Sequence, residues 1–194
     1  MTDPTSLITV GTSAGGVSAI TSLLQHLKNP FRTPIAFVQH LPSQAIIDVK
    51  LIYSRHTKGT VLEIEDKMPV EIGYIYFAPP GYHVLIEAEK FFSLSQDEPV
   101  HFSRPSIDVF FESAARVYGR SLTGILLTGA NQDGAQGLVA IQAHGGTTIV
   151  QNPNDAEVDI MPKGALRLLK PDYILTIPEI SMILSEREKN YDPR

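Results

Sequence analysis

Three polar residues in this sequence each follow a short apolar run, and their side chains are of the types that form a nucleophile and the groups that activate it. They are Ser13, His40 and Asp133. A serine hydroxyl can act as a nucleophile, an imidazole as its general base, and a carboxylate as the group that orients the base. The residues are far apart along the chain, so this chemistry requires a fold that brings them together. The apolar runs before them are residues 7–10, 35–38 and 124–127.

These runs fit the strands of a parallel sheet. Short β-branched runs alternate with segments of helical spacing, which is typical of βαβ units. The carboxyl ends of parallel strands share one edge of the sheet, where ligands bind. We therefore predict an α/β fold, a three-layer, doubly wound and mainly parallel sheet. We predict strands at 7–11, 34–39, 122–128, 147–151 and 173–177, and helices at 17–27, 44–56, 106–118, 134–144, 163–170 and 178–188.

Residues 59–103 interrupt the alternation of strands and helices. Short strand-like runs there are joined by turns rich in glycine and proline, including Pro79, Pro80 and Gly81. This pattern predicts an antiparallel hairpin insertion, placed along one edge of the sheet or over the site.

The composition indicates a globular protein and excludes several classes of function. A chain of 194 residues that is 43% hydrophobic and 19% charged can fill one core, so we expect a single domain over 1–194. The net charge of −5 offers no basic face for nucleic acid. Without cysteine there is no disulfide, thiolate metal site or cysteine nucleophile. The sequence has no signal-peptide start and no long apolar stretch, so we expect a cytoplasmic protein without membrane insertion.

The turn around Ser13 fits G-x-S-x-G over residues 11–15, between a predicted strand and a predicted helix. A dinucleotide-binding turn does not fit, because it would need glycine at position 13 and an acidic residue at the end of the next strand, which ends in Gln39 and His40. A P-loop would need a lysine after Gly16. A third alternative is that Ser13 only caps the first helix. The N–H groups at this helix start could also stabilise an oxyanion.

His40 is the histidine that we expect in the site. It lies one βαβ unit after Ser13, and adjacent strands are about 4.8 Å apart, so a hydrogen bond between the two side chains is feasible. The alternative is a loop histidine bonded to backbone. His83 and His101 belong to the hairpin region and lack this strand-tip position. His26, His56 and His144 lie within or at the ends of predicted helices, where exposure or capping explains them.

Asp133 has a strong structural alternative. With Gln136 three residues later it resembles a capping box for the helix that follows, although capping and catalysis can share a residue. Other acidic residues that could replace it in the site do not follow a long apolar strand directly. They are Asp66, Asp108, Asp155 and Asp159.

In the segments around Ser13, His40 and Asp133, and in several others, the chain resembles the catalytic domain of the CheB-type protein-glutamate methylesterases of chemotaxis. The resemblance extends over nearly its whole length. The order Ser, His, Asp agrees with that family and differs from the Ser, Asp/Glu, His order of α/β-hydrolases. Arg104 falls in a similar block and is a candidate substrate contact. For Ser106 the alternative is capping of a helix, and for Met161 it is packing in a core. The similar segments are 11–16, 39–42, 76–83, 103–108, 127–135, 151–152 and 161–162.

The resemblance implies hydrolysis of glutamyl 5-O-methyl esters on the cytoplasmic helices of methyl-accepting chemoreceptors, with glutamine deamidation by the same chemistry. Ser13 would be the nucleophile, His40 the base and Asp133 its orienting group. The backbone N–H groups of Ala14 and Ala130 would form the oxyanion site. The resemblance implies no metal or cofactor.

Two departures from the family pattern lie in the segments that contain Ser13 and Asp133. Ala14 stands where many members have threonine, which removes a proposed support for the histidine. Residues 129–131 read Gly-Ala-Asn where Gly-Met-Gly is common. We therefore retain two alternatives: an inactive receptor-binding or scaffolding domain of the same fold, and a phosphate- or nucleotide-binding module. Many members also carry a receiver domain, so we expect a stand-alone esterase, an excised domain or part of a fusion.

Overall fold

The computed structural model describes residues 6–27, 31–41 and 48–189. Their main feature is a parallel seven-stranded sheet in the order β3-β4-β2-β1-β7-β8-β9. The predicted α/β class with a mainly parallel sheet is therefore confirmed. The strands are β1 (Leu7–Thr12), β2 (Ile35–Gln39), β3 (Thr60–Glu63), β4 (Tyr74–Phe77), β7 (Leu122–Leu126), β8 (Thr147–Gln151) and β9 (Tyr173–Leu175).

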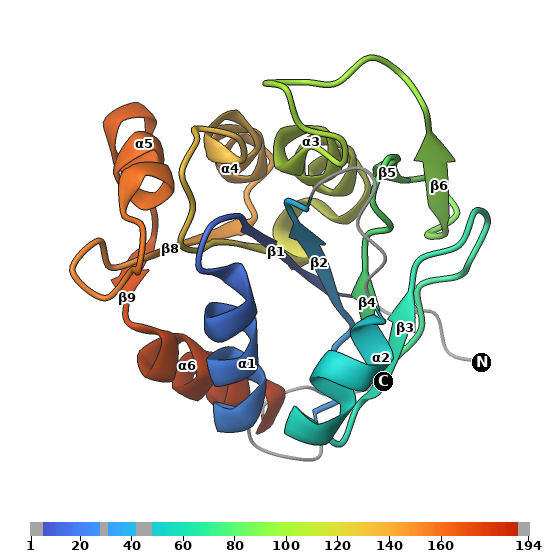
Figure 1. Cartoon of the computed structure of the whole chain (residues 1–194), viewed down its shortest axis with the longest axis horizontal. Coiled ribbons are helices and arrows are strands. Elements are labelled where there is room, and N and C mark those ends of the chain that lie inside the picture. The colour runs from blue at the N-terminus through green and yellow to red at the C-terminus, as the bar shows by residue number, and fades with distance from the viewer. Residues whose placement is uncertain (1–5, 28–30, 42–47, 190–194) are drawn as a thin grey trace.

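Helices cover both faces of the sheet, which gives three layers (Figure 1). On one face lie α1 (Gly16–His26), α2 (Val49–Tyr53) and α6 (Ile177–Lys189). On the other lie α3 (Ile107–Tyr118), α4 (Ala135–Ala143) and α5 (Ile160–Leu168). Short 3₁₀ turns follow α2 at Ser54–His56 and α3 at Gly119–Ser121. In the described ranges, no helix is long and apolar enough to cross a membrane.

Alternation along the strands divides the apolar residues between two cores. In β2, Phe37 packs on the face of α1 and α6, whereas Val38 packs on the face of α3 and α4. Phe37 stacks on Phe77, and Phe77 on Tyr53 of α2, with ring centroids 4.8 and 4.6 Å apart. The Tyr53 hydroxyl donates to Gln39 Oε1 at 2.8 Å. This contact fixes the carboxyl end of β2, immediately before His40.

The antiparallel insertion is shorter than the predicted 59–103. Its hairpin consists of β5 (His83–Ile86) and β6 (Phe92–Ser95), which lie beside α3 in Figure 1. The earlier runs form β3 and β4, which we expected to be antiparallel but which extend the main sheet in parallel. Val61 and Ile75 bury their side chains in the core of α1 and α6. Short apolar runs reveal strands but not their partners, which explains this error.

Several element ends differ from the predicted ends by a turn or less. Helix α5 includes Pro162, because proline is tolerated in the first turn of a helix. Strand β9 ends at Leu175 because Glu179 Oε2 accepts hydrogen bonds from both Thr176 N and Thr176 Oγ1, which caps α6. The predicted helix over 44–56 contains α2 and a 3₁₀ turn, and its residues 44–47 lie outside the described residues.

The sheet has a topological switch point between β1 and β7. The chain continues from β1 to β2 on one side, while β7 pairs with β1 on the other side. Such a point opens a crevice at the carboxyl ends of the strands. Gly11 of β1 is required here, since a Cβ atom would lie 2.4 Å from Ile107 Cγ2 of α3. The carboxyl ends of β1, β2 and β7 therefore lie side by side at this edge.

Candidate active site

Ser13 lies in the turn between β1 and α1 and does not cap the helix. The N-cap residue is Gly15, whose φ of 78° places it in the left-handed region that favours glycine. The Ser13 backbone is fixed, because its N–H donates to Thr128 O at 3.0 Å and its carbonyl accepts from Gly16 N at 2.9 Å. Its hydroxyl makes no hydrogen bond to any residue that the structure describes. The capping alternative is therefore wrong, and the hydroxyl remains available for chemistry.

His40 lies next to Ser13 across the sheet edge. Thr12 pairs with Gln39 in the β1–β2 register, and the His40 N–H donates to Thr12 O at 2.9 Å. Ser13 and His40 thus follow paired residues of adjacent strands. Both line an open cleft of about 660 Å³. The His40 side chain is 10% exposed, and its Nε2 atom lies 2.8 Å from Asp133 Oδ2.

Asp133 is fully buried and accepts four hydrogen bonds. Besides His40, its carboxylate accepts from Ser106 Oγ at 2.8 Å, Ile107 N at 2.7 Å and Asp108 N at 3.0 Å. Burial alone would raise the pKa of Asp133, but the bonds from His40 and from the Asp108 and Ile107 amides outweigh burial and lower this pKa. The carboxylate is therefore held ionised beside the imidazole.

The predicted capping box at Asp133 is wrong, because Asp133 binds the start of a different helix from the one that follows it. Helix α4 has Gly134 as its N-cap, without a side-chain cap, while Asp133 binds the first N–H groups of α3. The φ of Gly134 is 95°, and a Cβ atom there would lie 2.7 Å from Ile107 Cγ2. This close approach turns Asp133 toward α3 and His40. Ser106 is the N-cap of α3, as predicted, and its Oγ also accepts from Val109 N at 3.4 Å.

A second buried carboxylate, Asp108, lies in the first turn of α3, close to Asp133. Burial is the main cause that raises the pKa of Asp108 to about 6, the Gly137 amide opposes this rise, and the charge of Asp133 adds to it. Asp108 Oδ1 accepts from Gly137 N at 2.7 Å. It belongs to the packing of α3 on α4. The other acidic alternatives bind elsewhere: Asp66 accepts from Leu94 N, Asp155 from Gln151 and Ile177, and Asp159 pairs with Lys163.

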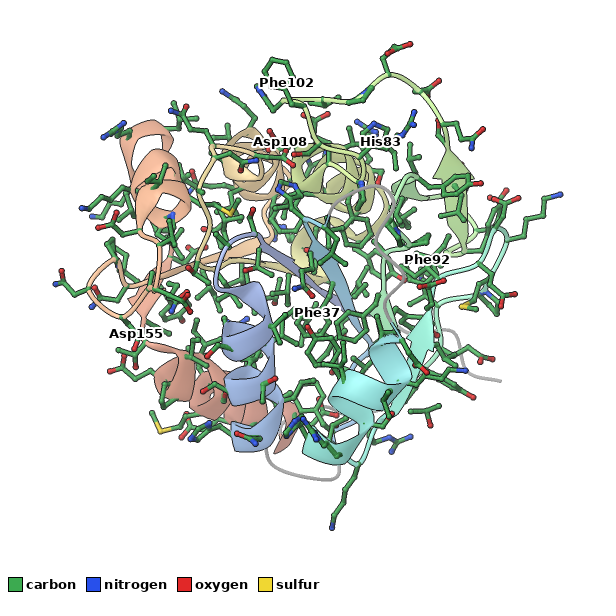
Figure 2. All side chains as sticks on the ribbon, viewed as in Figure 1. Phe37, His83, Phe92, Phe102, Asp108 and Asp155 are labelled. Carbon is green, nitrogen blue, oxygen red and sulfur yellow. The ribbon has the colours of Figure 1, made fainter. Side chains whose placement is uncertain are left out.

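The rival histidines have other partners. His83 is buried, with Nδ1 accepting from Ser106 N at 3.1 Å and Nε2 lying 3.1 Å from Glu98 O. Figure 2 shows it near Asp108, beside α3. His101 is largely exposed. His26 and His144 place Nδ1 on the carbonyl four residues earlier, as expected for helix ends.

The loop after β7 passes directly against Ser13. A Cβ atom on Gly129 would lie 3.0 Å from Ser13 Cβ and 2.6 Å from Met161 Cε, so a side chain here would press on Ser13 and displace the end of Met161. Ala130 follows this contact and is exposed. Ala14, next to Ser13, lines the cleft. The two residues predicted to form the oxyanion site therefore both adjoin the serine, and Met161 is buried beneath it, as predicted for a core residue.

Arg104 lines a pocket of about 240 Å³ that it shares with His40 and Leu41. Its Nη1 donates to Gln96 O at 2.8 Å and to Asp97 O at 3.0 Å. Within the described residues its buried Nε has no hydrogen-bond partner. The structure thus brings Arg104 close to the site, with part of its donor capacity engaged by the 96–97 backbone.

Sequence reasoning missed three side chains around the site. Ser106 binds Asp133, Asn131 binds His40, and Glu157 lines the cleft beside Ser13. The Asn131 contact spans 91 residues. No local pattern indicates such contacts, although the helix-cap signal at Ser106 did place that residue at a helix start.

Comparison with known proteins assigns the family. The family model described as CheB methylesterase matches residues 8–184, so the chain belongs to the CheB methylesterase family, a class of hydrolases. The crystal structure of the Thermotoga maritima CheB methylesterase catalytic domain superposes with a TM-score of 0.89 at 29% identity, covering 94% of this chain and 98% of that one. The predicted resemblance is confirmed.

Curated relatives agree with this family. A protein of Anaeromyxobacter dehalogenans named protein-glutamate methylesterase/protein-glutamine glutaminase 2 is 35% identical, over 93% of this chain and 52% of its own length. A Leptospira interrogans protein is 42% identical over 183 residues, 94% of this chain and 95% of its own length, and carries the same double name provisionally. The Myxococcus xanthus protein-glutamate methylesterase FrzG is 31% identical over 94% of this chain and 55% of its own length.

Proposed function

We propose that the chain is a serine hydrolase that removes methyl groups from glutamyl 5-O-methyl esters, using Ser13, His40 and Asp133. The observation that carries this proposal is the 2.8 Å hydrogen bond from His40 Nε2 to an ionised, buried Asp133, where His40 lines the same cleft as Ser13. The names of the relatives support the substrate class.

In the acylation step, Ser13 Oγ attacks the ester carbonyl and His40 takes the serine proton. The proton goes to Nδ1, because Nε2 already donates to Asp133. The negative charge of Asp133 stabilises the imidazolium that forms. The C–OCH₃ bond then breaks, His40 gives the proton to the leaving oxygen, and methanol departs from an acyl-Ser13 intermediate.

Water completes the reaction by the same route in reverse. His40 takes a proton from water, the hydroxide attacks the acyl carbon, and Ser13 leaves with the proton, which releases glutamate. The backbone N–H groups of Ala14 and Ala130 are the proposed donors to the oxyanion in both steps. Each such donor contributes about 3 kcal/mol to transition-state stabilisation in comparable enzymes. A glutamine side chain would pass through the same steps and release ammonia.

The proposed substrates are the cytoplasmic helices of methyl-accepting chemoreceptors, and we propose that the protein acts in the cytoplasm. A receiver domain or a fusion partner is the proposed regulator, since relatives such as the Anaeromyxobacter protein are about twice as long as the matched region. Arg104, beside His40 in the second pocket, is the proposed contact for the substrate backbone or a neighbouring acidic side chain.

Labelling with a fluorophosphonate probe tests whether the chain is an enzyme. The Ser13 oxygen displaces fluoride from phosphorus, and mass spectrometry locates the adduct. We expect labelling at Ser13, and methanol release from a methylated receptor fragment. Ser13→Ala or His40→Ala should lower methanol release by at least about a thousandfold while the fold survives.

An inactive receptor-binding domain predicts a different result. It would bind the receptor fragment without reacting with the probe, and neither substitution would change binding. Full methanol release by Ser13→Ala or His40→Ala would contradict the proposed roles. Ser18→Ala is a suitable control, because Ser18 is exposed on α1 and lines the same cleft.

A further inference from the structure

The base nitrogen of His40 already has a partner. Asn131, in the loop between β7 and α4, places its Nδ2 atom 3.3 Å from His40 Nδ1. This is the nitrogen that does not contact Asp133. Asn131 also departs from the family pattern, which commonly has glycine there.

The orientation of the Asn131 amide is fixed by a second contact. Its Oδ1 atom accepts the backbone N–H of Asp133 at 3.2 Å, and a backbone N–H can only donate. The Nδ2 atom must therefore face His40 and donate to it. Because His40 Nε2 faces an ionised carboxylate, the neutral ring carries its proton on Nε2 and presents a lone pair at Nδ1.

A neutral imidazole has one lone pair at Nδ1, so it accepts one strong hydrogen bond there. Asn131 occupies that position, while the Ser13 hydroxyl has no partner in the part of the chain that the structure describes. We propose that Asn131 is a positioning residue that holds the base nitrogen of His40 in the resting enzyme and must release it before Ser13 is activated. This inference rests on the proposed function.

The released amide has another acceptor within reach. Ser103 Oγ lies 3.4 Å from the same Nδ2 atom, in the loop before α3. Ser103 lines the pocket that also contains His40 and Arg104. The Asn131 amide can therefore leave His40 and still donate a hydrogen bond to Ser103. A substrate that fills this pocket can shift the amide, which would link binding to activation of the serine.

The rate of fluorophosphonate labelling at Ser13 tests this competition in the full chain. Asn131→Ala frees Nδ1 for Ser13, so we expect labelling about fivefold faster than in the wild type, the size of effect that one hydrogen bond gives. Asn131→Asp keeps the acceptor for Asp133 N but places a carboxylate beside Nδ1. This favours a protonated ring that cannot act as a base, so labelling should be at least about tenfold slower.

A merely structural role for Asn131 would slow both variants, so opposite directions distinguish the two roles. Gln136→Ala, exposed on α4, is the matched control and should label at the wild-type rate. Nitrogen NMR of wild-type His40 should show the proton on Nε2. If the wild type does not label at all, the proposed function is wrong. If it labels but Asn131→Ala is no faster, or Nδ1 carries the proton, the role of Asn131 is wrong.

Discussion

At the scale of single residues, the site depends on a negative charge that is held in place by donors. Asp133 is buried, yet four hydrogen bonds compensate its loss of hydration. Two of the donors are amides at the start of α3, where the helix dipole also favours an anion. The same contacts that stabilise the fold therefore keep this group charged for its proposed role beside His40.

Asp133→Asn should damage stability and activity together. An amide has one acceptor oxygen, so it cannot accept both from Ile107 N, which donates to Oδ2, and from Asp108 N, which donates to Oδ1, and the stability lost at pH 7 should be about 3–5 kcal/mol. Methanol release should fall at least about a thousandfold. Chemical unfolding and a methanol assay measure the two effects. Asp66→Asn, which changes an acidic residue away from the site, is the control and should leave methanol release unchanged.

The pH dependence of this loss follows from the lowered pKa of Asp133. A carboxyl group with a lowered folded pKa contributes stability that is complete above its unfolded pKa of 3.8 and is lost as the pH falls through the folded pKa. The difference between wild type and Asp133→Asn should therefore be constant from about pH 5 to 7 and shrink below pH 4. A difference that grows at acid pH would contradict the charged state.

The sequence predicted Ser13, His40 and Asp133 as strand-tip residues because each follows a recognisable apolar run. What it could not predict is how their surroundings are built. The carboxylate of Asp133 binds a helix 26 residues earlier in the chain, and Asn131 reaches a ring 91 residues away. Such contacts depend on the packing of α3 against β1 and β7, and local periodicity carries no information about them.

At the scale of elements, the N-terminal end of α3 holds two carboxylates with opposite pKa shifts. Asp133 gains donors there, whereas Asp108 loses more hydration than its bond to Gly137 N restores. The helix start therefore accommodates one full charge near pH 7 better than two. This arrangement favours Asp133 as the ionised group, and ionised Asp108 therefore lowers the stability of the fold at neutral pH.

Asp108→Asn should stabilise the protein at neutral pH. Because the pKa of Asp108 is raised to about 6, the folded state retains a proton between about pH 4 and 6 that the unfolded state has released, so this group lowers stability as the pH rises. Asparagine stays neutral and can still accept from Gly137 N. Urea unfolding should show a more stable variant at pH 7 and equal stability near pH 4. A variant that is less stable at pH 7 would contradict the raised pKa.

Two helical glycines should respond oppositely to alanine. Gly137 of α4 packs on α3 so closely that a Cβ atom would lie 2.5 Å from Phe111 Cβ, and Gly137→Ala should cost about 1–3 kcal/mol. Gly164 of α5 has room, since its nearest neighbour would be Gln132 Cγ at 3.4 Å. Gly164→Ala should therefore gain up to about 1 kcal/mol from helix propensity. Thermal unfolding compares them, and equal effects would mean that the α3–α4 contact is looser than described.

The elements differ in how well the sequence predicts them. Strands β1, β2, β7 and β8 are β-branched runs between clear helices, so their identity and parallel pairing follow from the alternation. Strands β3 and β4 lie between glycine and proline turns, like the hairpin after them. Which neighbour each strand joins is decided by the burial of Val61 and Ile75 in the core of α1 and α6, a property of the assembled molecule.

At the scale of the whole molecule, the site lies at the ends of central strands that are packed on every side. Strands β1 and β7 are buried along their entire length and have a strand on each side and helices on both faces. By contrast, β9 is an edge strand whose middle residue, Ile174, is 47% exposed. The turn of Ser13 and the loop of Asp133 thus extend from strands that we expect to open only when the molecule unfolds, which would pre-organise the site.

Amide hydrogen exchange should show this gradient directly. Hydrogen-bonded amides of β1 and β7 should exchange only through global unfolding, because local opening would expose both cores, whereas those of β9 should exchange at least about a hundredfold faster through local opening. Adding low concentrations of urea should accelerate β1 and β7 strongly and β9 little, since only global unfolding exposes a large surface. Mass spectrometry or NMR of the exchanging chain measures both rates. If the amides of β9 were as protected as those of β1, the edge of the sheet would unfold together with the site. The rigidity of the Ser13 turn would then come from the cooperative unfolding of the whole molecule and not from its central strands.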